Sequence, residues 1–325
     1  MGSNLSFLQP IHRELNNVEK ELHRQLSSAD SLSAKVGEYI FRSGGKRLRP
    51  ALLLLSAKHF GYNGAATIKI AAAVELLHTA SLLHDDVLDN ARLRRGAKSV
   101  NSVWGNKISI LIGDFLFAKS SAILSSYSQH NNVIQLFSRT MVKMVEGELL
   151  QIRKSRKIAI TEKDYIEIVD KKTAHLTSIA CKIGAILAGA KENNINAMAR
   201  FGRKLGIAFQ ITDDTLDYTS TENEFGKAIG KDIEEGKITL PLIYVLRNCN
   251  ATEKKPIHDA LLGVNGESNI KYIYKLIMKY RSIEYAKGIA KKISEDASSE
   301  LQNLKSSRAR DSLVKLAEYI IERRY

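Results

Sequence analysis

The chain has 325 residues and a formal net charge of +14, from 49 lysine and arginine residues against 35 aspartate and glutamate residues. Hydrophobic residues make up 44% and charged residues 26%, a balance that supports a large core and excludes an intrinsically disordered chain. A basic excess of this size favours an anionic partner: nucleic acid, an acidic membrane surface or a polyphosphorylated substrate. The basic residues are dispersed, without a long Lys/Arg run, so we predict no nucleic-acid partner.

The cysteines and the apolar runs bear on the compartment. Cys181 and Cys249 are far apart and lack metal-ligand spacing, which is typical of free thiols in a reducing compartment. No apolar run approaches the ~20 residues that cross a bilayer, and the N-terminus lacks an apolar signal core. We therefore predict a cytoplasmic protein without a transmembrane segment.

Apolar residues recur at helical spacing through most of the chain. Strand-like alternation, internal repeats and a Pro/Gly/Ser-rich linker are missing, and only 4 prolines occur. The pattern predicts an all-α fold of about ten or more helices in a single domain spanning residues 1–325. In chain order, the expected helices are Leu15–Leu26, Ala51–Phe60, Ile70–Asp89, Ile108–Leu124, Val133–Ile152, Thr173–Ala190, Ile195–Tyr218, Leu240–Arg247, Ile270–Lys279, Ile283–Leu304 and Arg310–Arg323.

The helix predicted over Ile70–Asp89 ends in a cluster of three acids. Asp85 and Asp89 are four residues apart, so both carboxylates lie on one helix face, with Asp86 beside them. Like charges at this spacing repel, and divalent cations would neutralise them; carboxylate oxygens are ligands that Mg²⁺ prefers. The alternative is an ordinary solvated helix end.

The same Asp-Asp-x-x-Asp spacing recurs 128 residues further along, after another apolar helix. Asp213, Asp214 and Asp217 form this second cluster, with Gln210 on the same helix face. Two matching clusters disfavour the solvated-end interpretation. We predict that they converge on a shared group of metal ions across a helical cleft.

Cationic and polar residues lie near both clusters in the sequence. Each has an ordinary surface, capping or core role as its alternative, and beside the acids each also suits a diphosphate. Lys46 and Arg49 sit in a glycine-rich turn before a helix, where anions are favoured. The others are His78, Arg94, Arg95, Lys172, Thr173, Lys227 and Lys237.

These motifs together resemble the trans-isoprenyl diphosphate synthases, or polyprenyl synthetases, along nearly the whole chain. The matching segments are Gly44–Pro50 (GGKRLRP), Leu82–Asp89 (LLHDDVLD), Arg94–Gly96 (RRG), Gly147–Gln151 (GELLQ), Lys172–Thr173 (KT), Gln210–Asp217 (QITDDTLD) and Gly226–Pro241 (GKAIGKDIEEGKITLP). Ala228 stands where the family often has proline. The resemblance implies a bundle of mostly antiparallel helices around a deep central cavity, the isoprenoid synthase fold, usually as a homodimer.

The resemblance also implies the reaction and the role of each residue. The enzyme would condense isopentenyl diphosphate with an allylic diphosphate, farnesyl or geranylgeranyl diphosphate, using on the order of three Mg²⁺ ions per active site. Asp85, Asp89 and Asp213 would bind the metal directly, with Asp86, Asp214 and Asp217 supporting them. Arg94, Lys172, Thr173, Gln210, Lys227 and Lys237 would hold the allylic diphosphate, and Lys46, Arg49, His78 and Arg95 isopentenyl diphosphate.

Residues one and two turns before Asp85 bear on product length. Ala80 and Ser81 are small, and Leu77 and Val74 follow, whereas many short-product members carry an aromatic residue near Ser81. Phe137 on another helix is a candidate floor, with core packing as its alternative. We predict a medium-to-long all-trans, octaprenyl-like product for a quinone side chain, with transient membrane contact for its release. The alternatives are a short-chain farnesyl or geranylgeranyl diphosphate synthase, a terpene cyclase and a non-catalytic subunit of a heteromeric synthase.

Overall fold

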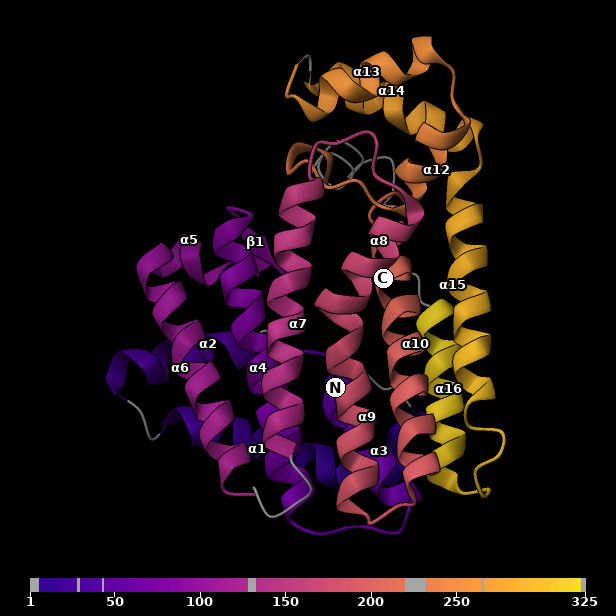
Figure 1. Cartoon of the computed structure of the whole chain (residues 1–325). Helices are drawn as coiled ribbons and strands as arrows, with labels where there is room; N and C mark the ends of the chain where they lie inside the picture. The colour runs from indigo at the N-terminus through magenta and orange to yellow at the C-terminus, as the bar shows by residue number, and fades with distance from the viewer. Residues whose placement is uncertain are drawn as a thin grey trace. The chain divides into compact units, whose positions relative to one another are not determined.

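The structure, a computed structural model, describes residues 6–27, 30–42, 44–127, 133–219, 232–264 and 266–322. Nearly all of this part of the chain is helical, which confirms the predicted all-α class (Figure 1). The elements up to residue 125 are η1 (a 3-10 helix, Ser6–Ile11), α1 (His12–Ser27), α2 (Ser31–Arg42), α3 (Leu48–His59), α4 (Ala66–Leu88), β1 (Leu93–Arg94), β2 (Ala97–Lys98), α5 (Val100–Trp104) and α6 (Asn106–Ser125).

The later elements are again helices. They are α7 (Val133–Lys154), α8 (Glu162–Val169), η2 (a π-helix, Asp170–Ala174), α9 (His175–Leu187), α10 (Glu192–Leu216), α12 (Leu240–Asn248), α13 (Ala251–Leu261), α14 (Gly266–Lys279), α15 (Ser282–Ser299) and α16 (Arg308–Glu322). The chain divides into two compact units. Unit 1 comprises Met1–Arg139, Leu176–Gly202 and Asn303–Lys315; unit 2 comprises Thr140–His175, Arg203–Gln302 and Leu316–Tyr325. That they work as a single domain stays a prediction.

Unit 1 is built around α4, which packs against α1, α3 and α6. Apolar residues surround α4 on several sides, and its residues Ile70–Leu77 are all buried, as expected of a central helix. Small residues allow α9 to approach α3 closely: a Cβ added to Gly184 would lie 2.4 Å from the Leu53 carbonyl oxygen. The Ser56 hydroxyl donates to the Cys181 carbonyl at 2.6 Å beside this contact. This packing holds the helix that carries the first acid cluster.

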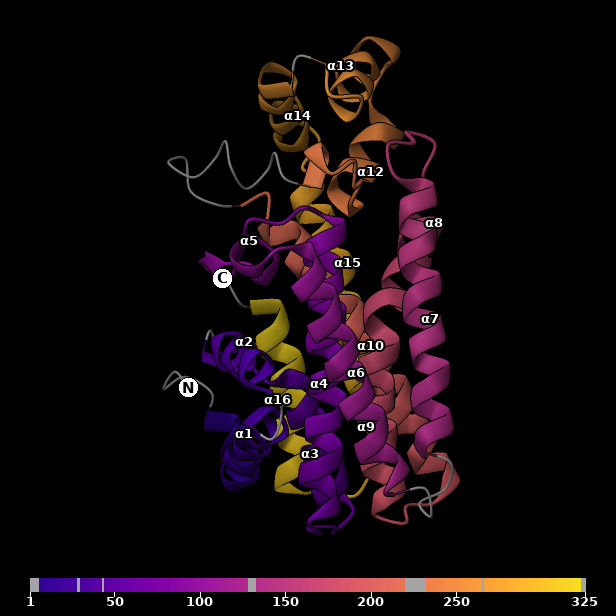
Figure 2. The ribbon, with the colours of Figure 1, turned by 90° about the vertical axis from the view of Figure 1, so that its left-hand side faces the viewer.

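Unit 2 has its own core, made by residues of α8, α10, α12, α14 and α15. Tyr218 and Ile211 near the end of α10 are buried in it, together with Leu242 and Ile273. In Figures 1 and 2 the orange helices α13 and α14 lie side by side. The same core therefore supports the segment that carries the second acid cluster.

Among the described residues, four α-helices, the 3-10 helix η1 and one hairpin were not expected from the sequence. The helices α2, α5, α8 and α13 have at most 12 residues each, so their apolar pattern extends over only a few turns. Pro256 lies inside α13, where a helix break would be expected, but Asn250 and Glu253 form a capping box at the start of that helix. The expected helix over Thr173–Ala190 was also wrong at its start, because helical structure begins at Glu162 and continues through η2 into α9. The two-residue strands β1 and β2 pair as a hairpin after α4.

Two findings concern the expected compartment. Among the described residues, α4 and α6 are long and apolar enough to cross a membrane by length and composition alone. The core helix of a globular unit passes the same test, and 72% of the apolar window of α4 is buried, against 39% for α6. Cys181 and Cys249 are both buried free thiols.

Candidate active site

The first acid cluster occupies the last turns of α4 in unit 1. Asp85 and Asp89 are partly exposed, whereas Asp86 is only 2% exposed. Arg94 of the hairpin donates from Nε to Asp86 Oδ1 at 2.9 Å, and its terminal nitrogen contacts the same oxygen. Asp86 is thus neutralised by a neighbouring arginine, while Asp85 and Asp89 are more open to solvent. The positions agree with the direct and supporting roles predicted for these acids, which stay predictions.

The basic turn before α3 lies near the arginines of the hairpin. Arg95 donates to the Gly44 carbonyl, and a Cβ added to Gly45 would lie 2.8 Å from an Arg95 nitrogen. Desolvation, and then the charges of Arg49, Arg95, Arg94 and Arg47, lower the pKa of His78 well below its usual value. His78 is therefore a neutral imidazole. The structure brings Arg49, His78 and Arg95, three of the four residues predicted to hold isopentenyl diphosphate, into one electropositive neighbourhood.

Neighbouring cations in this turn have different environments. Lys46 is exposed, whereas the Arg47 side chain is only 4% exposed and pairs with Glu19 at 2.5 Å and Glu75 at 3.0 Å. Glu75 is as deeply buried as Arg47. Arg47 is the N-cap of α3 and has a left-handed backbone with φ of 48°. Its role is therefore to fix the turn, which leaves Lys46 at the surface.

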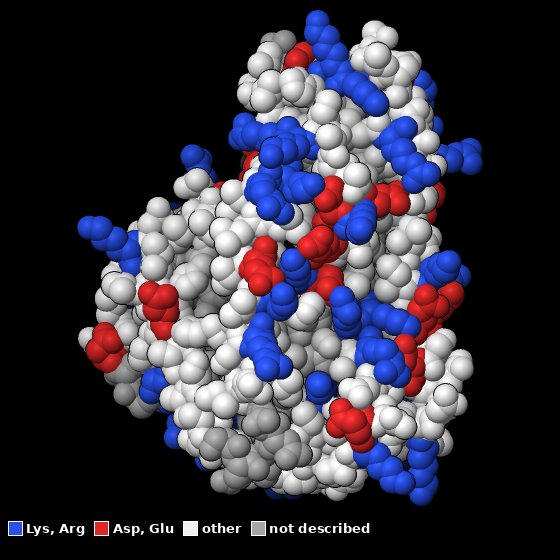
Figure 3. All heavy atoms as spheres, in the orientation of Figure 1, with Lys and Arg blue, Asp and Glu red and all other residues white. Residues whose placement is uncertain are grey.

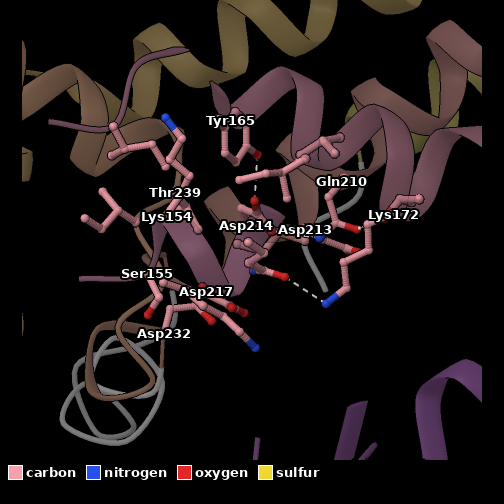
Figure 4. A pocket seen from close by; sticks show the side chains of 18 residues that line it. Lys154, Ser155, Tyr165, Lys172, Gln210, Asp213, Asp214, Asp217, Asp232 and Thr239 are labelled. Atoms are coloured by element: carbon pink, nitrogen blue, oxygen red, sulfur yellow. Dashed lines mark hydrogen bonds between the residues drawn. The ribbon is translucent and has the colours of Figure 1, made fainter. Parts of the chain in front are cut away.

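The second acid cluster lines a pocket of about 550 Å³ in unit 2 (Figure 4). The volume falls in the range usual for small-molecule sites, ~300–1,000 Å³. Asp213, Asp214 and Asp217 line it at the end of α10, and Lys172 and Thr173 line it from η2, while the binding roles of these residues stay predictions. The other lining residues are Gln151, Lys154, Ser155, Ile160, Tyr165, Ile168, Val169, Gln210, Leu216, Asp232, Lys237, Ile238 and Thr239.

A chain of hydrogen bonds crosses this pocket between η2 and α10. The Thr173 hydroxyl donates to Gln210 Oε1 at 2.9 Å, and the Gln210 amide donates to Asp214 Oδ1 at 2.8 Å. From α8, the Tyr165 hydroxyl donates to Asp214 Oδ2 at 2.6 Å, and Figure 4 shows this contact as a dashed line. Both carboxylate oxygens of Asp214 are therefore held by neutral donors, which fixes its orientation.

Lys172 is held on the opposite side of the same segment. Its ammonium donates to Gln151 Oε1 at 2.9 Å and forms an ion pair with Glu148, both on α7. The expectation that Lys172 and Thr173 open a helix was wrong, because they lie inside η2, in the middle of helical structure. They reach the pocket from a π-turn and not from a helix N-terminus.

Mutual repulsion among the carboxylates is the main electrostatic feature of the pocket. Burial, and then the charge of Asp232, raises the pKa of Asp214 to about 7. Partial desolvation and the charges of Asp232, Asp214 and Asp213 also raise the pKa of Asp217. A divalent cation between these groups would reverse the effect, and carboxylate oxygens suit Mg²⁺. The donor set therefore fits this ion.

The number of carboxylates per ion also suits magnesium. Among the described residues, no three acid, histidine or cysteine side chains already converge on one point as a closed metal site. Mg²⁺ usually binds through one or two carboxylates, with waters and substrate phosphates completing its shell. The pocket thus supplies part of a coordination sphere and leaves room for phosphate oxygens.

Basic residues accompany the pocket. Blue side chains gather over the C-terminal end of α7, whose last turn carries Arg153 and Lys154 (Figure 3). Lys237 lines the pocket and pairs with Glu235 at 2.7 Å. Lys227, predicted to hold the allylic diphosphate, lies outside the described residues.

The residues proposed to set product length lie in or beside the core of unit 1. Val74, Leu77 and Ala80 on α4 are buried, as is Phe137 on α7, and Ser81 is partly exposed. The Ser81 hydroxyl donates to the His78 carbonyl of its own helix at 2.8 Å. Burial agrees with both a tunnel wall and plain core packing, so the length-setting role stays a prediction.

Several pocket residues were not identified from the sequence. Tyr165 belongs to α8, a helix whose weak apolar pattern was overlooked, so nothing marked its hydroxyl. Asp232 and Gln151 lay inside matching segments without an assigned role. The proximity of Asp232 to Asp217 is a tertiary contact that no local sequence pattern reveals. That the clusters around Asp85 and Asp213 share one site stays a prediction, because each belongs to a different unit.

Comparisons with known proteins place this fold and these residues in a family. Residues 30–319 match the polyprenyl synthetase family. The chain is 34% identical to octaprenyl diphosphate synthase of Escherichia coli over 311 residues, which cover 96% of each protein. It is 35% identical to geranylgeranyl diphosphate synthase of Sulfolobus acidocaldarius over 329 residues, covering 98% of this chain and 100% of that protein.

A solved structure agrees with these sequence relatives. The polyprenyl synthase of Caulobacter crescentus, in complex with calcium and isoprenyl diphosphate, superposes with a TM-score of 0.92 at 31% identity. The match covers 98% of this chain and 97% of that one. The fold is thus the all-α fold of the isoprenyl diphosphate synthases, and the enzyme is a prenyltransferase. The chain belongs to the polyprenyl synthetase family.

Adjacent cations in the basic turn should differ in their effect on stability. Arg47→Met leaves the buried Glu75 carboxylate without this partner, and loss of one member of a buried pair costs about 3–5 kcal/mol. Lys46→Met, at an exposed position, should change the free energy of unfolding by no more than ~0.5 kcal/mol. Urea denaturation followed by circular dichroism measures both. Equal stabilities of the two variants would contradict the structural role of Arg47.

Proposed function

We propose that this chain condenses isopentenyl diphosphate with an allylic diphosphate, farnesyl or geranylgeranyl diphosphate, in a Mg²⁺-dependent reaction. The observation that carries the proposal is the pocket in unit 2. Four carboxylates and the Lys172 ammonium share one cavity of about 550 Å³ there, next to the hydroxyl of Thr173. Groups of both signs suit a diphosphate bound together with cations. Support also comes from the Caulobacter crescentus relative, which was solved with calcium and isoprenyl diphosphate.

The residues of the pocket would bind the allylic substrate by its diphosphate. Lys172 and Thr173 would contact its oxygens, with Lys237 adding positive charge and Gln210 orienting the hydroxyl of Thr173. Arg94 of unit 1 stays proposed for the same diphosphate on the family resemblance alone. Cations placed where negative charge develops on the departing diphosphate lower the barrier to breaking the bond between C1 and oxygen. The tight hydrogen bonding of Asp214 means that this environment is arranged before substrate arrives.

Magnesium would be held by Asp213 in unit 2 and by Asp85 and Asp89 in unit 1, with Asp86, Asp214 and Asp217 supporting. When bound, the ions supply Lewis-acid neutralisation of the diphosphate. The basic neighbourhood of unit 1 would hold isopentenyl diphosphate: Lys46, Arg49 and Arg95 by charge, and His78 as a neutral hydrogen-bond donor. The double bond of that substrate attacks the allylic cation, and the departing diphosphate takes up the proton that is lost.

For the product we propose a medium-to-long all-trans polyprenyl diphosphate, octaprenyl-like and destined for a quinone side chain. The support is the absence of a large ring among four α4 residues one to three turns before Asp85: Val74, Leu77, Ala80 and Ser81. Ionisation is common to the family, so length must come from the space given to the growing tail. A short product remains the second candidate, because the Sulfolobus acidocaldarius relative is a geranylgeranyl diphosphate synthase.

We further propose a homodimer that works in the cytoplasm and touches membranes only to release its product. The support for a dimer is an apolar stripe on α7. Val142, Val145, Leu149 and Ile152 are each more than half exposed and recur at intervals of three and four residues. Large side chains aligned on one exposed helix face are typical of a surface that another chain covers.

Loss of one carboxylate should abolish turnover without unfolding the chain. Purified enzyme is incubated with Mg²⁺, labelled isopentenyl diphosphate and farnesyl diphosphate, and the products are sized by chromatography. Asp213→Ala should lower kcat by about 10²-fold or more, because stabilisation of the leaving group is lost. Asp311→Ala removes an exposed acid of α16 and should retain full activity. A wild-type chain that forms no prenyl product, or an Asp213→Ala enzyme of near-normal rate, would overturn the assignment.

A ring at position 81 should shorten the product. In Ser81→Phe the side chain stands one turn before Asp85, where we place the descending tail. The product distribution should shift to fewer isoprene units, while Ser81→Ala should leave it unchanged. Reversed-phase chromatography of the dephosphorylated products measures both. An unaltered distribution in Ser81→Phe would show that the tail takes another direction.

A charge on the apolar stripe should separate the dimer. Sedimentation equilibrium of the wild-type chain should give twice the mass of one chain, and Leu149→Glu should shift it towards the mass of a single chain. Leu262→Glu, at a similarly exposed leucine after α13, is the control and should keep the larger mass. A monomeric wild-type protein would refute the dimer, and an unchanged mass in Leu149→Glu would refute the role of α7.

A further inference from the structure

The segment that carries Lys172 and Thr173 is a π-turn. In η2 the backbone N–H of His175 donates to the carbonyl of Asp170, five residues earlier, in place of the usual four. Such turns are rare, bond less favourably than an α-helix, and occur mostly at functional sites. Because η2 interrupts otherwise continuous helical structure between α8 and α9, something outside the segment must hold it in place.

One restraint is the close approach of α7. A Cβ added to Gly147 would lie 2.7 Å from the backbone nitrogen of Lys172 and 2.9 Å from Lys171 Cβ. Backbone atoms cannot give way as a flexible side chain would, so the absence of a side chain at position 147 is what permits this contact. The contact supports η2 from one side and does not orient it.

The second restraint is an ion pair from α10. Arg203 donates from Nε to Asp170 Oδ1 and from its terminal nitrogen to Asp170 Oδ2, each at 2.6 Å. This is the two-pronged geometry that makes arginine–carboxylate pairs directional. Asp170 is only 8% exposed, and its carbonyl accepts a further hydrogen bond from His175 Nδ1 at 2.9 Å. Asp170 therefore bonds to its own helical segment through its carbonyl and to α10 through its carboxylate.

Arg203 and Gln210 are seven residues apart, two turns along the same face of α10. Arg203 donates to Asp170 at the start of η2, and Gln210 accepts a hydrogen bond from Thr173 three residues later. Both contacts tie the π-turn to the helix that carries Asp213 and Asp214. They thereby fix the position of the proposed diphosphate-binding side chains relative to the second acid cluster.

We propose that the Asp170–Arg203 pair is a positioning device that holds η2 so that Lys172 and Thr173 meet the allylic diphosphate. The inference rests on the proposed function. The Arg203 side chain is 56% exposed, whereas Asp170 is buried, so loss of Arg203 leaves a buried carboxylate without this partner and lowers stability. A purely structural pair would have that effect and leave the kinetics almost unchanged. A positioning pair also changes the binding of one substrate and not of the other.

The kinetic test compares Arg203→Met with a matched variant on the same helix. Lys204→Met breaks the ion pair between Lys204 and Glu300, 2.8 Å long, which does not involve η2. We expect Arg203→Met to raise the KM for farnesyl diphosphate about tenfold and to leave the KM for isopentenyl diphosphate within about twofold, with a lower melting temperature because Asp170 loses this partner. Lys204→Met should change neither KM. Arg203→Lys keeps the charge but not the two-pronged geometry and should recover part of the loss.

Two further measurements do not depend on turnover. Isothermal titration of Mg²⁺ and inorganic pyrophosphate should show weaker pyrophosphate binding in Arg203→Met than in the wild type or Lys204→Met. Hydrogen exchange should show faster exchange of the His175 amide in Arg203→Met alone, because that amide makes the π-type hydrogen bond.

The outcomes separate the two proposals. If the wild type forms no prenyl product, the proposed function fails, and titration and exchange still decide the role of Arg203. If the wild type is active and Arg203→Met changes both KM values equally, or changes only the melting temperature, the positioning role is overturned. Unaltered pyrophosphate binding together with unaltered exchange at His175 overturns it as well.

Discussion

Carboxylates gathered in a partly desolvated pocket dominate the electrostatics of unit 2 around the end of α10, because burial and then mutual repulsion disfavour their charged forms. Asp213, Asp214, Asp217 and Asp232 line one cavity, and burial together with the charge of Asp232 raises the pKa of Asp214 to about 7. The hydrogen bonds from Tyr165 and Gln210 to Asp214 act in the opposite direction and hold it in one orientation. A pocket of this kind is suited to cations, and through them to polyanions such as diphosphates.

The charge of the first acid cluster is balanced differently, by an arginine of the protein. Arg94 neutralises Asp86 within the protein, whereas Asp85 and Asp89 are more exposed to solvent. Next to it, the charges of Arg49 and Arg95 face His78, whereas Arg47 and Arg94 are paired with acids of the same unit. The unit 2 pocket combines carboxylates with lysines. The two places therefore differ in how their charges are balanced.

The relatives of this chain differ in the length of the product that their names record, although they cover nearly the same residues at similar identity. Shared diphosphate chemistry accounts for the common fold and motifs. Overall similarity therefore identifies the reaction class and does not distinguish the product length.

Much of this architecture follows from sequence periodicity. The long helices α4, α7 and α10 were expected, because apolar residues recur at helical spacing along each of them, and α4 is buried on several sides as a central helix. The acids at 85–89 and 213–217 and the basic residues near them were also identified, because fixed spacing on a helix places side chains on one face. Short or polar helices such as α8 and α13 were missed, since their stability comes from capping and tertiary packing.

The sequence by itself determined the all-α class, the two acid clusters and the residue types that accompany them. Only the tertiary structure decided that Arg47 is buried between Glu19 and Glu75. The same is true of the place of Tyr165 and Asp232 beside the second cluster. It also decided that Lys172 and Thr173 lie in a π-turn that Arg203 contacts through Asp170. The physical reason is the distance along the chain over which each effect acts. Helical periodicity acts over a few residues, whereas these contacts join side chains tens of residues apart, and their partners are chosen by packing.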